Sequence, residues 1–101
     1  MQTLSLDQFK RSLSADAPPA LPAALSALWW IGRGADGWDR AHALVQDEPG
    51  ADAAWVHAHL HRVEGDAGNA DYWYRRAGRP SEVGSLSAEW DAIAASLLAG
   101  A

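Results

Sequence analysis

The sequence of 101 residues contains no cysteine and no long apolar run. Without cysteine the chain can form neither a disulfide framework nor a thiolate metal site, which fits a reducing compartment. No run approaches the roughly 18 apolar residues that a membrane-spanning helix needs. The first residues also lack a basic segment followed by an apolar one, which is the pattern of a secretory signal. We therefore expect a cytoplasmic protein that contacts no membrane.

Positive charge is scarce as well, with 8 basic against 13 acidic residues and a net charge of −5. This balance gives no overall attraction to nucleic acid. Aromatic and basic residues do alternate from Tyr72 to Arg76, but consecutive helical residues point in different directions and cannot form one stacking platform. We expect no nucleic-acid partner. No residue set matches a known catalytic signature, so we also expect a non-enzymatic protein without a cofactor.

The apolar residues recur at the three- and four-residue spacing of helices, and no alternating run is typical of a strand. About half of the residues are apolar, which is enough for one core in a chain of this length. The sequence therefore predicts a single all-α domain. Its expected parts are an N-terminal helix with a proline-rich loop (5–20), a first helix pair (21–48), a second helix pair (51–79) and a C-terminal helix (85–99).

The second helix pair is the centre of this organisation. Its first helix, from about Asp52 to Glu64, has packing residues on two sides, so we expect a central and mostly buried helix. Gly65 and Asp66 then favour a tight turn into the next helix. The C-terminal helix has an apolar stripe that includes Trp90, and we expect this stripe to dock on the helix that contains Tyr74.

The second pair also carries a recurring set of small, aromatic and turn residues: Ala58, Gly65, Asp66, Ala70, Tyr74, Ala77 and Pro80. This set resembles a tetratricopeptide repeat, and a shift of 29 residues lays it over the first pair. The resemblance implies tandem antiparallel helical hairpins with capping helices at both ends. The stretch from His59 to Gly78 is also similar to that of small uncharacterised proteins, a similarity that implies no activity.

In a repeat of this kind the first helices of successive pairs line a concave groove. The resemblance implies that this groove contains Trp30, Arg33, Trp55, His59 and Arg62. Aromatic faces beside guanidinium groups suit a peptide carboxylate or another planar anion. We therefore predict an interaction module that binds a peptide or a partner protein. In the alternative interpretation the tryptophans fill the core and the arginines lie over it.

A second candidate site lies on another side of the central helix. His57, His61 and Glu64 are spaced at i, i+4 and i+7, so they share one side and form a possible three-ligand metal face. With His42 they could instead line a metal-free pocket in which histidine acts as acid or base. A buried hydrogen-bond network without a ligand is the third interpretation. The alternative function is thus a small-molecule- or metal-binding protein, or a small enzyme.

Overall fold

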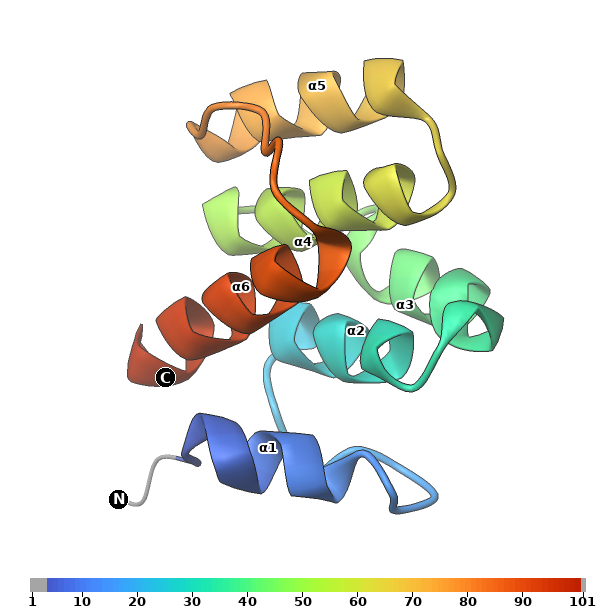
Figure 1. Cartoon of the computed structure of the whole chain (residues 1–101), viewed down its shortest axis with the longest axis vertical. Helices are drawn as coiled ribbons and strands as arrows, with labels where there is room; N and C mark the ends of the chain where they lie inside the picture. Colours follow the sequence, from blue (N-terminus) through green and yellow to red (C-terminus); the bar gives the residue numbers. More distant parts are fainter. Residues whose placement is uncertain (1–3, 101) are drawn as a thin grey trace.

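The computed structural model describes residues 4–100 and confirms the all-α fold: within that range it contains helices and no strand. The short 3₁₀ helix η1 (Ala35–Gly37) leads directly into α3. Figure 1 shows α4 between α5 on one side and α2 on the other. The six α-helices in the described part of the chain are α1 (Leu6–Ser12), α2 (Ala23–Gly32), α3 (Trp38–Val45), α4 (Ala51–Val63), α5 (Ala67–Ala77) and α6 (Leu86–Gly100).

Local side-chain chemistry sets the ends of α5. The carboxylate of Asp66 accepts a hydrogen bond from the backbone N–H of Asn69 at 3.1 Å, which satisfies one of the free amides at the start of the helix. Gly65 precedes this cap with φ of 85°, and Gly78 closes the helix with φ of 73°. Both angles lie in the left-handed region, which glycine adopts at little cost. The turn expected at Gly65 and Asp66 therefore forms.

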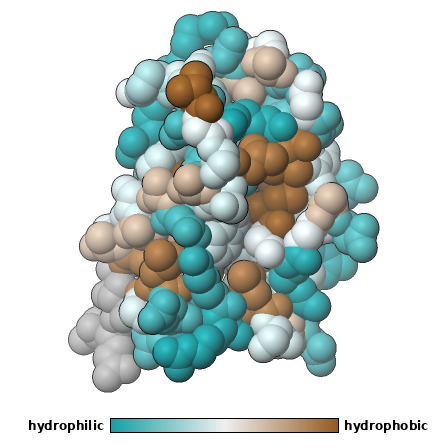
Figure 2. All heavy atoms as spheres, in the orientation of Figure 1, coloured by the Kyte–Doolittle hydropathy of each residue, from teal (hydrophilic) through white to brown (hydrophobic). Residues whose placement is uncertain are grey.

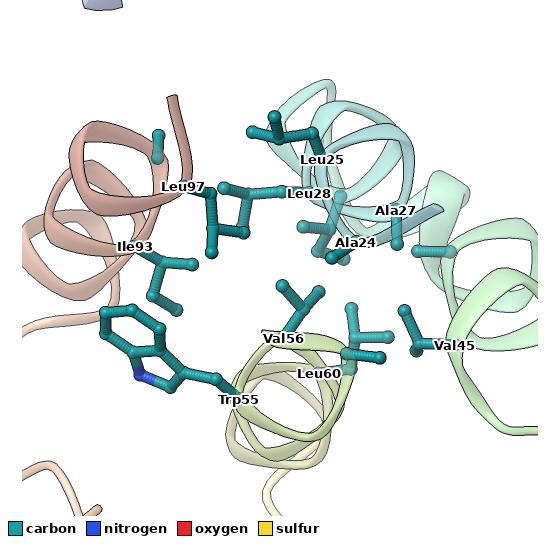
Figure 3. Close-up of a cluster of buried hydrophobic side chains, with 14 of the residues drawn as sticks. Ala24, Leu25, Ala27, Leu28, Val45, Trp55, Val56, Leu60, Ile93 and Leu97 are labelled. Atoms are coloured by element: carbon teal, nitrogen blue, oxygen red, sulfur yellow. The ribbon is translucent and has the colours of Figure 1, made fainter. Parts of the chain in front are cut away.

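Helix α4 is the centre of the core, as expected. Every residue from Ala53 to His61 is buried, and the helix packs against α2, α3, α5 and α6. Figure 3 shows Val56 and Leu60 of α4 pointing toward α2, and Trp55 lying beside Ile93 of α6. Burying a large apolar side chain contributes about 1.5–3 kcal/mol, so this convergence of helices on α4 stabilises the fold.

The expected docking of α6 on the Tyr74 helix is wrong. Helix α6 packs against α2, α4 and α1 instead. Trp90 stacks on Phe9 with ring centroids 5.5 Å apart and donates its indole N–H to the Leu28 carbonyl at 2.9 Å. The physical reason is that α4 already covers the apolar face of α5, whereas α1 and α2 offer α6 an uncovered apolar surface. The hydroxyl of Tyr74 does reach α6, where it donates a hydrogen bond to Glu89.

The helices pack in pairs at the positions that the sequence favours, α2 with α3 and α4 with α5. The tetratricopeptide-like stacking of tandem hairpins stays a prediction. Between residues 4 and 100 no helix has both the length and the apolar character required to cross a bilayer.

Candidate functional site

Three histidines from two helices meet where α3 packs on α4. His42 comes from α3, and His57 and His61 come from successive turns of α4. Their ring centroids are 4.7 Å apart for His42 and His57, 4.9 Å for His57 and His61, and 5.5 Å for His42 and His61. We call these residues the three-histidine cluster. His57 and His61 are buried, whereas His42 is half-buried and lies nearer the surface.

Hydrogen bonds orient two edges of this cluster. The Nε2 atoms of His42 and His57 are 3.0 Å apart, so one ring donates to the other. His61 places Nδ1 2.6 Å from a carboxylate oxygen of Glu64. Because a carboxylate accepts, Nδ1 of His61 carries the hydrogen, and in the neutral ring Nε2 keeps a free lone pair. Glu64 thereby fixes the tautomer of His61.

Two tryptophans hold the rings in place. Trp73 stacks on His57 with centroids 3.8 Å apart and planes inclined by 19°. Trp38 stacks on His42 at 4.7 Å and donates its indole N–H to the Leu60 carbonyl at 2.6 Å. Each indole covers one face of its imidazole and restricts rotation of that ring. The cluster is therefore preorganised by packing as well as by hydrogen bonds.

Burial disfavours a positive charge on two of the three rings, His57 and His42. Desolvation, and to a smaller extent the nearby charges that His42 and His61 can carry, lower the pKa of His57 to about 4. The pKa of His42 is also lowered, again chiefly by burial. Nδ1 of His57 has neither a hydrogen-bond partner nor solvent contact among residues 4–100. An unpaired buried polar atom of this kind lowers the free energy of unfolding by about 1–3 kcal/mol, so this atom of the cluster destabilises the fold.

The geometry of the cluster fits a metal ion. His42, His57 and His61 each offer one nitrogen, and these three atoms lie within 4.8 Å of one another. The sequence places Glu64 third in this set, but in the structure His42 provides the third nitrogen and Glu64 orients His61. A second group, made of His61, Glu64 and Asp66, meets the same distance limit on the outer side of the cluster.

Two residues of the expected peptide groove instead meet a buried carboxylate. Nδ1 of His59 lies 2.7 Å from Glu89, and Arg62 donates to the same oxygen at 2.8 Å. Tyr74 donates to the other oxygen. Burial alone would raise the pKa of Glu89, but the hydrogen bonds from His59, Tyr74 and Arg62 outweigh it, and this pKa lies below its ordinary value. Glu89 is thus a buried, ionised acceptor for three helix-borne donors.

The other groove residues lie in separate places. The guanidinium of Arg79 stands 3.4 Å from the centre of the Trp55 ring, and Trp55 itself is buried. Trp30 lies under Arg40 at 4.5 Å, with Arg33 6.0 Å from the same ring. The structure therefore brings His59 together with Arg62, and Trp30 together with Arg33. Trp55 lies apart from both pairs, under Arg79.

Sequence reasoning missed Glu89, Trp38 and Trp73 as site residues. A signal for Glu89 is present: it falls three residues after Leu86 and four before Ile93, inside the apolar stripe of α6, where a carboxylate needs partners. The two stacking tryptophans carry no such local signal, because each belongs to the apolar face of its helix and meets histidine only through tertiary packing.

A scan of protein-family models, a search of curated proteins and a search of solved structures each found no match to this chain.

Proposed function

We propose that this protein binds a divalent transition-metal ion, with Zn²⁺ as the ion to test, through His42, His57 and His61. The observation that carries the proposal is the convergence of three imidazole nitrogens within 4.8 Å. Imidazole is the nitrogen ligand that Zn²⁺ prefers, and three histidines leave the fourth position of a tetrahedral ion for another ligand. This function corresponds to the alternative that the sequence offers, with His42 as the third ligand.

The separation of the nitrogens supports the proposal. Two ligands on a tetrahedral Zn²⁺ with bonds of about 2.0–2.1 Å stand about 3.3 Å apart. The Nε2 atoms of His42 and His57 are 3.0 Å apart, so an ion requires only a small opening of this pair. An ion between the rings would replace the hydrogen bond in which one neutral imidazole donates to the other.

The protonation states support it too. A histidine binds a metal through a neutral ring, so a bound proton competes with the ion. The lowered pKa of about 4 keeps His57 neutral near pH 7. Glu64 holds the hydrogen of His61 on Nδ1 and leaves Nε2 free, which is the usual role of a carboxylate beside a metal-bound histidine. His57 therefore has no second proton to lose before an ion binds.

Isothermal titration calorimetry with ZnCl₂ tests the proposal on the whole chain. We expect one Zn²⁺ per chain, with an affinity that falls at least about 100-fold in His42→Ala, because even loss of an orienting partner costs about 10–100-fold. His42 is half-buried, so this variant keeps its fold, which circular dichroism checks. His59→Gln is the control, since His59 lies on α4 with His57 and His61 but bonds Glu89. Equal zinc affinity in His42→Ala and the parent contradicts the proposal.

Thermal unfolding separates a metal site from a closed hydrogen-bond network. An ion that prefers the native state raises the melting temperature in proportion to the logarithm of its concentration. We expect Zn²⁺ to stabilise the parent and to have no such effect on His61→Ala. If the histidines only complete a network, His61→Ala loses about 1–3 kcal/mol of stability and Zn²⁺ stabilises neither protein.

A further inference from the structure

A second candidate site lies away from the three-histidine cluster, in a hollow between the ends of α2 and α4 and the start of α6. Its volume is about 410 Å³, within the range of small-molecule sites. Apolar side chains make most of its wall: Leu13, Ile31, Val63, Leu86 and Trp90. In Figure 2, apolar surface is open to view on the face where α6 begins. We call this hollow the α6 pocket.

One polar side chain of the α6 pocket is held in a single orientation. His59 lines the pocket and is only 2% exposed. Its Nδ1 donates to Glu89 at 2.7 Å, and Glu89 is fixed in turn by Arg62 and Tyr74. The ring therefore cannot turn to offer Nδ1 to anything else. The opposite edge, with Nε2, is the part of His59 that remains available.

Nε2 of His59 has no hydrogen-bond partner among the described residues. The one buried side-chain nitrogen or oxygen in residues 4–100 without partner or solvent contact is Nδ1 of His57. Nε2 of His59 therefore keeps contact with solvent, and the pocket that His59 lines is where this contact can occur. With the hydrogen on Nδ1, Nε2 of the neutral ring is an acceptor, so it selects a donor.

The charges around the α6 pocket are balanced. Lys10 and Asp91 lie at its rim and form an ion pair at 3.0 Å. Glu89 behind His59 is paired with Arg62 at 2.8 Å. An anionic ligand would have to displace Asp91 from Lys10, and a cationic one would have to displace Lys10 from Asp91. The pocket therefore favours an uncharged ligand.

We propose that the α6 pocket binds a small, neutral and mainly apolar molecule that carries one hydroxyl group. The hydroxyl donates its hydrogen bond to Nε2 of His59, and the apolar body packs on Trp90, Leu86 and Val63. A single fixed polar group in an apolar wall is the usual arrangement by which such pockets orient a ligand. This site uses none of the three-histidine cluster, so it stands independently of the proposed metal site.

Two probes of matched shape test the proposal, p-cresol with its hydroxyl and toluene without one. Both are titrated into the whole chain while the indole N–H resonance of Trp90 is followed by nuclear magnetic resonance. We expect p-cresol to bind at least tenfold more tightly than toluene, about the worth of one hydrogen bond. Equal affinity of the two probes, or no shift with either, overturns the proposal.

Two variants locate the binding. Ser87 is exposed and lines the α6 pocket, so Ser87→Phe fills the pocket without entering the core. Ser96 is exposed later on the same helix, and Ser96→Phe is the matched control. We expect p-cresol binding to be lost in Ser87→Phe and kept in Ser96→Phe and His42→Ala. Unchanged binding in Ser87→Phe, or equal loss in both phenylalanine variants, overturns the assignment to this pocket.

Discussion

The Nε2 atoms of His42 and His57 lie 3.0 Å apart, although the residues belong to different helices and are separated by 15 positions in the chain. This contact exists only when α3 is packed on α4. Burial and the neighbouring histidines disfavour a proton on either ring, and for His42 they outweigh the carboxylates of Glu64, Asp39 and Asp47, which favour one. The pair therefore links the protonation of the cluster to the stability of the fold.

We expect the free energy of unfolding to fall as the pH is lowered through the weakly acidic range. Unfolded His57 takes up a proton near pH 6.5, whereas in the folded protein its pKa is about 4. As the pH falls below about 6.5, the unfolded state therefore binds more protons and gains stability relative to the folded state. Below about pH 4 His57 is protonated in both states, and its contribution to stability is fully lost. Urea denaturation should show a loss of about 2 kcal/mol between about pH 7.5 and about pH 5.

The variant His57→Gln is the control for this pH dependence. Its side chain does not titrate, so the loss of stability with falling pH should shrink to the share of His42, whose pKa is lowered in the same direction. The lowered pKa values of Glu89 and Asp66 act at more acidic pH, and measurement above about pH 5 leaves them out. A variant whose pH dependence matches that of the parent would exclude His57 as the cause.

Removing the Glu89 carboxylate should be among the most damaging single changes. Glu89→Ala leaves Arg62, His59 and Tyr74 without their shared acceptor, and breaking a buried ion pair costs about 3–5 kcal/mol. Asp91→Ala, two residues later, removes an exposed ion pair with Lys10 and should cost no more than about 1 kcal/mol. Similar denaturation midpoints for the two variants would show that the Glu89 network does not stabilise the fold.

Enlarging a small residue between α4 and α5 should also destabilise the protein. Ala70 is 2% exposed and Ala58 on α4 is fully buried, so Ala70→Leu has to force extra volume between packed helices. We expect a cost of about 1–3 kcal/mol from overpacking. Ala67 is exposed on the same helix, and Ala67→Leu should leave the melting temperature nearly unchanged. An equal effect of both substitutions would refute the close packing at Ala70.

Local patterns were sufficient to predict the helices and part of the cluster. The i, i+4 spacing of His57 and His61 fixes their shared side on α4, because helical geometry depends only on separation along the chain. The burial of α4 also followed from its two packing sides. In both cases the information lies within a few consecutive turns.

The parts that could not be predicted depend on how helices meet. The periodicity of α6 identifies Trp90 as buried, but it does not say whether α1, α2 or α5 covers it. In the same way, no local pattern reveals that Arg62 and His59 turn to Glu89, 27 and 30 residues away. The five residues that the repeat resemblance places in one groove do not lie together for this reason. Two of them, His59 and Arg62, bond the buried carboxylate of Glu89 instead.

X-ray absorption at the zinc edge tests the proposed metal site most directly, because it reports the atoms bound to the ion. For the parent loaded with one equivalent of Zn²⁺ we predict three imidazole nitrogens at about 2.0–2.1 Å, and for His42→Ala we predict two. A first shell made of water and carboxylate oxygens, or one that is the same in both proteins, would contradict binding by His42, His57 and His61.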